Sequence, residues 1–306
     1  MTNIKHPGLR VIDRFKYTLK YYDSLDMFAE NLKYESCSCS IALKDTSLDI
    51  ELHLKKARHK KLVVMLGGAK VNQDWGKEGP FFLGREFSKS IESNILFISD
   101  PSFAYDKNIK LGWYLGTKKS NGQEAVKRLI DIVVQKFNIE KLIFFGGSGG
   151  GFASMQAAHH FPDSISIVWN PQIDVLNYHV KEVTKETFEL AYDASPTNEI
   201  NGINLDISNV YNEHTKNKVI YWQNLTDHHV KEQLNPFLSK QGLLEIEDEF
   251  IGWVNDWLFL FVTNIEKRHT PPPKNILLKI LQFVVNNDIN KTSVEFLFDS
   301  IYTDSV

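Results

Sequence analysis

The sequence predicts an α/β fold, with a mainly parallel central sheet flanked by helices. Short apolar runs alternate with amphipathic segments of helical spacing, and this alternation is typical of strand–helix–strand units. Several runs are apolar without a break, as expected for strands that are buried on both faces. One of them, residues 141–145, leads directly into a glycine-rich turn around Ser148 and then into a helical segment. A parallel sheet between helices accounts for all three observations.

The composition is that of a globular protein without a polyanionic partner. Of the 306 residues, 42% are hydrophobic, which is enough to build a sizeable core. The net charge of −3 argues against a nucleic-acid-binding protein. There is no apolar leader and no run of about 18 apolar residues, so we expect a cytoplasmic protein without a membrane span. Cys37 and Cys39 would lie on one face of a strand, which is a poor geometry for a disulfide.

In the first half of the chain, predicted strands alternate with predicted helices, as in a sheet covered by helices. Residues 1–35 would be an N-terminal appendage to the main domain, 36–306. The helix at 122–138 carries apolar residues at spacings of three and four, as does a helix packed on a sheet. Strands are predicted at 37–43, 48–54, 62–66, 95–99 and 142–145, with a further helix at 84–93.

The alternation continues after the glycine-rich turn. Residues 175–215 contain no clear buried strand, so we predict an insertion or cap there, over the carboxyl ends of the strands. Three prolines mark the start of the helix at 275–285. Strands are predicted at 166–169, 218–223 and 257–262, and further helices at 152–160, 230–240 and 292–302.

The turn around Ser148 has the pattern of a nucleophile elbow. In Gly146-x-Ser148-x-Gly150, the glycines let neighbouring backbone segments pass close to a strained strand-to-helix turn that exposes the serine hydroxyl. A phosphate-binding loop is the alternative, but the Gly-Lys-Ser/Thr ending of such a loop is missing. The pattern therefore favours a nucleophilic serine.

A nucleophilic serine needs a histidine base and a carboxylate to orient that base. In an elbow-containing sheet the chain order is Ser, then Asp or Glu, then His. Asp227 follows the strand at 218–223 and His269 follows the strand at 257–262, so the sequence predicts the triad Ser148, Asp227 and His269. Two alternatives stay open: Asp227 caps the following helix instead, or Asp174, after the preceding strand, is the triad acid.

Acyl transfer also requires donors for the oxyanion of the tetrahedral intermediate. The backbone N–H of Gly149, directly after the serine, would supply one donor. The turn after the strand at 62–66 would supply the second, from Gly68 or Ala69. We expect no metal, because the side chains of His228 and His229 should diverge and cannot chelate one ion together with their neighbour Asp227 alone.

Three aromatic residues, Trp75, Trp113 and Tyr114, follow sheet strands on the side where the active site would open. They are candidates for binding the substrate, by stacking on a sugar ring or an acyl carrier. Burial in the core is the default for each of them.

Six short segments resemble bacterial capsular-polysaccharide O-acetyltransferases and the acetyltransferase component of the accessory Sec system, within the α/β-hydrolase superfamily. The resemblance covers about residues 36–290 and implies an α/β-hydrolase fold. It also implies acetyl-CoA as the donor, an acetyl-Ser148 intermediate, a carbohydrate acceptor, and a capsule-biosynthesis complex as a partner. Arg268 stands before His269, where many hydrolases have glycine. The six segments are 99–101, 111–114, 146–151, 170–172, 223–229 and 269–273.

The residues leave two other functions open. One is a carbohydrate esterase with the same triad, in which water instead of a sugar hydroxyl attacks the acyl-enzyme. The other is a catalytically inactive, hydrolase-like subunit of a glycan-biosynthesis complex. The sequence does not distinguish a monomer from an oligomer.

Overall fold

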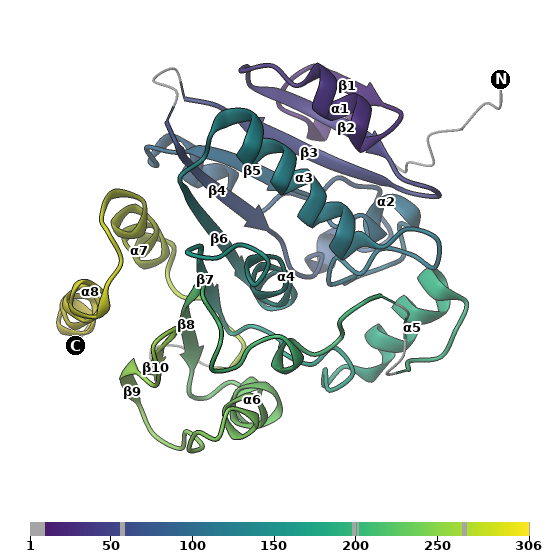
Figure 1. Ribbon diagram of the computed structural model, residues 1–306. Coiled ribbons are helices and arrows are strands. Elements are labelled where there is room, and N and C mark those ends of the chain that lie inside the picture. The colour runs from purple at the N-terminus through teal and green to yellow at the C-terminus, as the bar shows by residue number, and fades with distance from the viewer. Residues whose placement is uncertain (1–9, 56–58, 198–199, 201, 265–267, 306) are drawn as a thin grey trace.

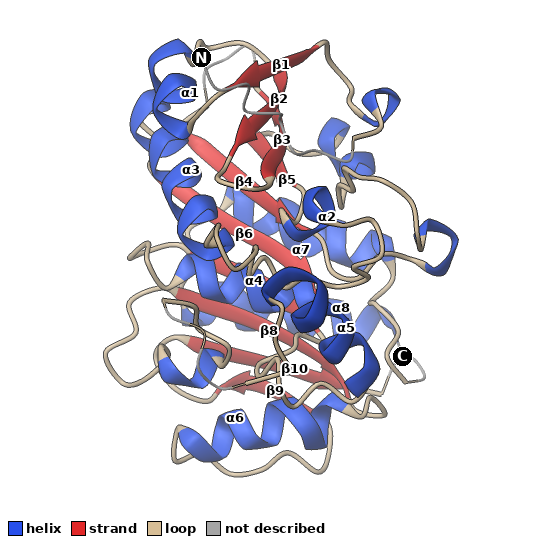
Figure 2. Ribbon diagram, turned by 90° about the vertical axis from the view of Figure 1, so that its right-hand side faces the viewer, coloured by secondary structure: helices blue, strands red, loops and turns tan. Residues whose placement is uncertain are grey.

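A ten-stranded, mainly parallel sheet runs through the molecule (Figures 1 and 2). The computed structural model describes residues 10–55, 59–197, 200, 202–264 and 268–305. In spatial order the strands are β1 (Leu19–Tyr22), β2 (Cys37–Ala42), β3 (Ser47–His53), β5 (Asn94–Ile98), β4 (Lys61–Leu66), β6 (Lys141–Gly147), β7 (Ile165–Trp169), β8 (Lys218–Asn224), β10 (Leu258–Thr263) and β9 (Phe250–Trp253). In this order all neighbouring strands from β5 to β10 are parallel, whereas β3 and β9 run antiparallel to their neighbours.

Helices cover both faces of this sheet (Figure 1). Helices α1 (Leu25–Asn31), α3 (Gly122–Phe137) and α4 (Gly149–Ala158) pack on one face, and α7 (Lys274–Asn286) and α8 (Lys291–Ser305) pack on the other. Helices α2 (Ser102–Tyr105), α5 (Lys181–Tyr192) and α6 (Asn235–Lys240) lie in other connections between strands. Single helical turns occur at Ile12–Arg14, Asn72–Asp74, Arg85–Lys89, Ile207–Asn209 and Val230–Leu234.

The continuous apolar runs exist because both sheet faces are covered. In β4, Leu62, Val64 and Leu66 point into the cluster formed with α3, while Val63 and Met65 point into the cluster formed with α7 and α8. All five side chains are fully buried. Successive side chains of a strand point to opposite faces, so a strand between two helical layers has to be apolar at every position.

Two predicted helices differ from the structure. Instead of a helix at 84–93 there is one short 3₁₀ segment, Arg85–Lys89, which begins after Gly84 in a left-handed conformation and is closed by i to i+3 hydrogen bonds. The helix at 230–240 begins with a π-helical turn. The small strands β1 and β9 were not predicted, because their residues are only partly buried and alternate weakly.

The segments predicted as an appendage and as a cap both pack on the main body. Residues 10–35 contribute β1, which extends the sheet alongside β2, and α1, whose Leu25 and Phe28 enter the core. Residues 175–215 contribute α5, where Phe188 is fully buried and the Thr187 hydroxyl donates a hydrogen bond to the Leu111 carbonyl. Both segments thus bury apolar side chains in the clusters that flank the sheet.

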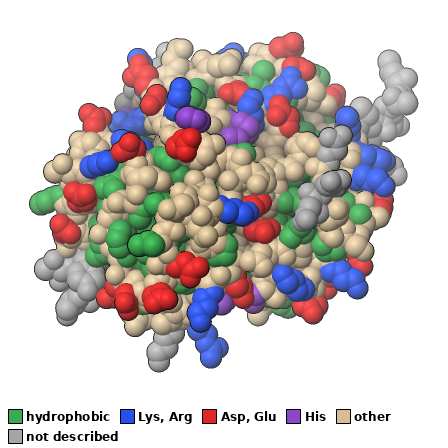
Figure 3. Space-filling view, turned by 60° about the horizontal axis from the view of Figure 1, so that its bottom comes forward, with side chains coloured by type: hydrophobic (Ala, Val, Ile, Leu, Met, Phe, Trp, Pro, Cys, Tyr) green, Lys and Arg blue, Asp and Glu red, His purple; other side chains and the backbone are tan. Residues whose placement is uncertain are grey.

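The molecular surface carries charges of both signs. On the face shown in Figure 3, the acidic and basic side chains are interspersed. None of the helices in the described ranges has the length and the apolar character needed to cross a bilayer.

Candidate active site

Ser148 lies between β6 and α4 in the backbone conformation that an elbow requires. Its φ of 54° and ψ of −124° belong to a region that residues other than glycine rarely adopt. A Cβ atom on Gly146 would overlap the carbonyl group of Gly150, and one on Gly150 would overlap the carbonyl oxygen of Leu66. The two glycines of the pattern are therefore required by close backbone contacts on either side of the serine.

Asp227 and His269 come together at the carboxyl ends of β8 and β10. The His269 Nδ1 lies 2.7 Å from the Asp227 Oδ2, and the other carboxylate oxygen accepts the backbone N–H of His229 at 3.0 Å. Burial alone would raise the pKa of Asp227, but the hydrogen bond with His269 and the nearby histidines lower it overall. The aspartate is thus a buried anion, and it can fix the tautomer and the orientation of His269.

The alternative acid, Asp174, has a different role in the structure. Its carboxylate accepts the backbone N–H groups of Leu176 at 2.9 Å and Asn177 at 3.3 Å. Burial raises its pKa. These contacts cap a turn after β7, and among the described residues it is Asp227 that holds the His269 ring.

The Ser148 hydroxyl accepts a hydrogen bond from the side chain of Gln172, at 3.3 Å. Gln172 is fully buried, and its side-chain oxygen accepts the indole N–H of Trp113. No hydrogen bond joins the described side chains of Ser148 and His269. Because Nδ1 of His269 is bonded to Asp227, Nε2 is the ring nitrogen that can act as the base. Catalytic hydrogen bonds often shorten only when substrate is bound.

The turn after β4 packs against the elbow, as an oxyanion site requires. A Cβ atom on Gly68 would lie 3.0 Å from the Gly147 carbonyl oxygen and 3.5 Å from the Gly149 nitrogen. Ala69 follows on the exposed side. Gly149 begins α4, so its amide belongs to the unpaired N–H groups at a helix N-terminus, which favour negative charge. The predicted donors Gly149 and Gly68 thus lie side by side.

Two of the three aromatic residues are not placed to contact a substrate directly. Trp113 and Tyr114 are 0% and 2% exposed, so the expectation of open ring faces does not hold for them. The Tyr114 hydroxyl accepts the backbone N–H of Gly67 and donates to the Ile98 carbonyl, both at 2.8 Å, and thereby holds the turn after β4. Trp75 is 48% exposed, and its substrate contact stays a prediction.

Two buried asparagines, for which the sequence predicted no role, hold the backbone around His269. The Asn170 side-chain amide donates to the Thr270 carbonyl at 2.9 Å, and the Asn224 side-chain amide donates to the Arg268 carbonyl at 2.6 Å. The Asn170 side-chain oxygen in turn accepts the backbone N–H of Asn224 at 2.8 Å. The available signal was their position directly after or at the end of buried apolar strands, where polar side chains mark a site.

If His269 is the predicted base, we expect Asn224→Ala to lower kcat about a hundredfold with little change in KM, because the backbone before His269 would lose a support and a shift of about 1 Å can cost that much. Steady-state kinetics with a fixed acceptor measures the effect. Asn217→Ala is the matched control, since Asn217 is equally buried but bonds the Tyr211 hydroxyl instead. Equal losses in the two variants would show that the effect is a general loss of structure.

His229 is a fully buried histidine beside His269. Its Nδ1 lies 3.0 Å from the Asn170 carbonyl oxygen, so the N–H on this nitrogen donates there. Its ring centre is 4.4 Å from that of His269. Burial, followed by the charge of His269, lowers the pKa of His229 to about 3. The ring is therefore neutral near pH 7.

This neutral histidine should make the protein sensitive to acid. The pKa rises from about 3 in the folded state to about 6.5 on unfolding. The unfolded chain therefore binds the extra proton between these values, and the free energy of unfolding decreases as the pH is lowered through this range, by up to about 1.4 kcal/mol per pH unit. Urea unfolding at pH 7.5, 6.0 and 5.0 measures the slope. His229→Gln should flatten it relative to wild type, whereas the exposed His214→Gln should not.

A scan against protein-family models and a search of curated proteins find no match to the sequence. Solved structures do match. The capsule O-acetyltransferase of Neisseria meningitidis serogroup A, in complex with caged gadolinium, superposes with a TM-score of 0.54 at 13% identity, over 81% of this chain and 94% of that chain. The acylaminoacyl peptidase of Pyrococcus horikoshii gives 0.51 at 13% identity, over 83% of this chain and 42% of that chain. The glycosylation-associated protein (Gap123) complex of Streptococcus agalactiae superposes with a TM-score of 0.50 at 13% identity, over 81% of this chain and 46% of that chain.

The sheet order, the elbow after β6 and these superpositions decide the architecture. The chain has the α/β-hydrolase fold. In the α/β-hydrolase fold the nucleophile, the acid and the base follow one another along the chain and meet at the carboxyl ends of the strands. Ser148, Asp227 and His269 follow that order at the ends of β6, β8 and β10. The fold prediction is confirmed.

Proposed function

We propose that the chain is a serine O-acetyltransferase that moves an acetyl group from acetyl-CoA to a hydroxyl of a capsular or other surface carbohydrate. The observation that carries the proposal is the 2.7 Å contact between Asp227 and His269 after β8 and β10, in the sheet whose strand β6 ends at the strained Ser148. A buried carboxylate bonded to Nδ1 of a histidine orients the ring, so that Nε2 can accept a proton as the general base.

The proposed reaction has two halves. In the first, His269 Nε2 takes the Ser148 proton as the serine oxygen attacks the thioester carbonyl, and the N–H groups of Gly149 and Gly68 or Ala69 stabilise the oxyanion. The C–S bond then breaks, and CoA leaves as a thiol with the proton from His269. In the second half, His269 takes a proton from a sugar hydroxyl, whose oxygen attacks acetyl-Ser148. A carbohydrate ester forms, and Ser148 regains its proton.

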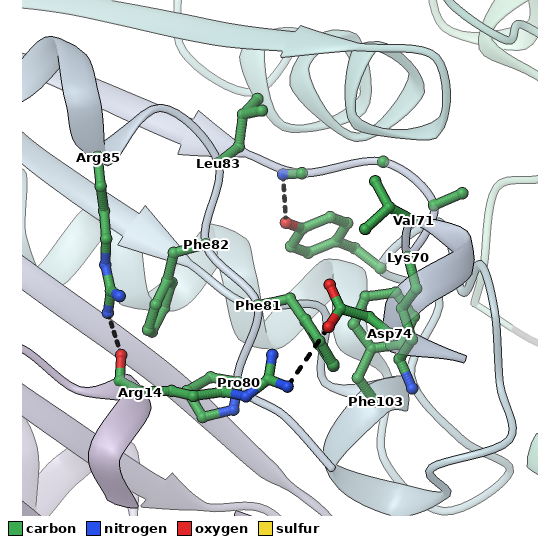
Figure 4. Close-up of a pocket in the computed structure, with 14 residues that line it drawn as sticks. Arg14, Lys70, Val71, Asp74, Pro80, Phe81, Phe82, Leu83, Arg85 and Phe103 are labelled. Atoms are coloured by element: carbon green, nitrogen blue, oxygen red, sulfur yellow. Dashed lines mark hydrogen bonds and ion pairs between the residues drawn. The ribbon is translucent and has the colours of Figure 1, made fainter. Parts of the chain in front are cut away.

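A basic cavity next to the predicted oxyanion turn suits an anionic donor (Figure 4). It has a volume of about 320 Å³ and is lined by three basic residues, Arg14, Lys70 and Arg85, and one acidic residue, Asp74. The Arg14 guanidinium lies 4.2 Å from the centre of the Phe81 ring. Cations next to aromatic rings are suited to phosphates and to an adenine base. This cavity therefore supports CoA as the carrier.

A second cavity borders the triad acid and is a candidate site for the acceptor. It has a volume of about 790 Å³, and Asp227 and His228 form part of its wall. Glu245, Glu247 and Lys231 are also among its lining residues. Carboxylates and an ammonium group can bond the hydroxyl groups of a sugar.

The structural neighbours agree with this proposal. A solved structure of the meningococcal capsule O-acetyltransferase is a complex with CoA, at 13% identity to this chain and a TM-score of 0.51. The streptococcal neighbour is a glycosylation-associated complex. These neighbours support acetyl-CoA as the donor here and a glycan-biosynthesis complex as the setting.

Incubation with acetyl-CoA and candidate capsular oligosaccharides tests the proposal. We expect CoA release that depends on the oligosaccharide, together with acetylated sugar detected by mass spectrometry. CoA release without sugar modification, combined with deacetylation of an acetylated glycan, would establish the esterase instead. Neither activity with any acyl donor, in a protein that binds glycan, would favour the inactive subunit.

A further inference from the structure

We propose that His179, His228 and His229 form a Zn²⁺ site beside the catalytic residues, and that the bound ion inhibits acyl transfer. His179 lies between β7 and α5, whereas His228 and His229 lie in the turn after β8. One ring nitrogen from each can be chosen such that all three lie within 4.8 Å of one another. Imidazole nitrogens are good ligands for Zn²⁺, and three protein ligands plus a water are typical of an open site.

The ring nitrogens that face one another are available as ligands. The His228 Nε2 lies 2.8 Å from the His179 Nδ1, and the two ring centres are 3.8 Å apart. Two nitrogens bound to one tetrahedral zinc are about 3.3 Å apart, because each Zn–N bond is about 2.0–2.1 Å long. The two rings therefore have to separate by only about half an ångström to admit the ion.

His229 supplies the independent sign of a ligand. Its Nδ1 is committed to the Asn170 carbonyl, and its Nε2 is buried without a hydrogen-bond partner in the described part of the chain. An unpaired buried acceptor costs about 1–3 kcal/mol. Metal-binding histidines characteristically donate their second N–H to a carbonyl or carboxylate in this way. The His229 ring is thus prepared for a metal on its Nε2.

His228 has a similar arrangement on its far side. Its Nδ1 lies 3.2 Å from Asp227 Oδ1, which gives a carboxylate–histidine pair directed at the proposed ion. The two adjacent histidines do not diverge as they would in a strand, because His229 has helical backbone angles, and their ring centres are 4.6 Å apart. The third ligand comes from a distant part of the sequence, which is why neighbouring residues alone did not predict the site.

Two features lead us to expect inhibition: His228 and His269 share the carboxylate of Asp227, and the bound ion is positively charged. This part of the inference rests on the proposed function. Asp227 accepts from His269 through one oxygen and faces His228 through the other. A zinc-bound His228 would draw on the same carboxylate that stabilises protonated His269 in the transition state. The ion's two positive charges would lie on the His229 side of His269 and oppose that protonation further.

Zinc binding can be measured without any assay of catalysis. We would titrate the metal-free full-length protein with ZnCl₂ in competition with a chromogenic chelator, for the wild type and for His179→Ala. His214→Ala is the matched control, since His214 is also exposed but lies outside the cluster. We expect one ion per chain, and at least about tenfold weaker binding for His179→Ala alone.

Two results would overturn the site. One is equal affinity in wild type, His179→Ala and His214→Ala. The other is weakening by His269→Ala without weakening by His179→Ala, which would place the ion on Asp227, His229 and His269, the second group whose donor atoms lie within 4.8 Å. His228→Gln gives a second test of the same ligand set, and circular dichroism checks that each variant is folded.

The inhibition is tested separately, with acetyl-CoA turnover in the presence of ZnCl₂. Zinc should abolish turnover of the wild type, a chelator should restore it, and His179→Ala should need at least about tenfold more zinc. If zinc binds at the three histidines and turnover is unchanged, the inhibitory role is wrong while the site stands. If no turnover is found even without zinc, the proposed function fails and the binding result is unaffected.

Discussion

Ser148→Ala should abolish acetyl transfer, with kcat falling by about four orders of magnitude or more, because the variant has no oxygen to carry the acetyl group. The sharpest measurement is the intact mass after exposure to acetyl-CoA without an acceptor. We expect one acetyl adduct on the wild type and none on the variant. This measurement identifies the nucleophile and the donor together.

Ser154→Ala is the matched control for this substitution. Ser154 lies on α4, six residues after the nucleophile, and its buried hydroxyl has no hydrogen-bond partner among the described residues. Its replacement should leave both the adduct and the turnover near wild type. An adduct that persists in Ser148→Ala would place the acetyl group on another residue and refute the mechanism.

Asp227→Asn should have the next largest effect, a fall in kcat of about ten-thousandfold at almost unchanged structure. An amide facing Nδ1 of His269 favours the wrong tautomer and does not stabilise the protonated ring. The low pKa of Asp227 means that the wild-type group is a carboxylate at neutral pH. Stopped-flow measurement of CoA release would show whether acetylation of the enzyme is the step that slows.

Asp174→Asn is the natural comparison, because Asp174 was the alternative acid. Its carboxylate caps a turn, so we expect a modest loss of stability and a kcat within a few-fold of wild type. A larger loss of kcat in Asp174→Asn than in Asp227→Asn would reverse the assignment of the triad acid.

The positions of the central strands along the chain, and the elbow, could be predicted from the sequence because their signals are local. Apolar runs covered on both faces, and glycines that flank a serine, depend on residues that are adjacent in the chain. The chain order of serine, aspartate and histidine then placed the acid and the base at the ends of later strands. The structure brings Asp227 and His269 together there.

The surroundings of the site could not be predicted in the same way, since they depend on contacts between distant segments. Trp113 is a residue type that often binds substrates, but its indole N–H donates a hydrogen bond to Gln172 from another loop. His179 is 49 residues from His228 in the chain, so no local pattern links their rings. Whether an aromatic or imidazole ring is buried or open is decided by such pairings.

The hydrogen bonds around His269 have a consequence for how this protein can vary. The backbone at Arg268 and Thr270 is held by Asn224 and Asn170, which lie at the end of β8 and directly after β7. The position of His269 therefore depends on two strand ends that are distant from it in the chain. Homologous proteins should keep both asparagines together, because the loss of either one would remove part of this support.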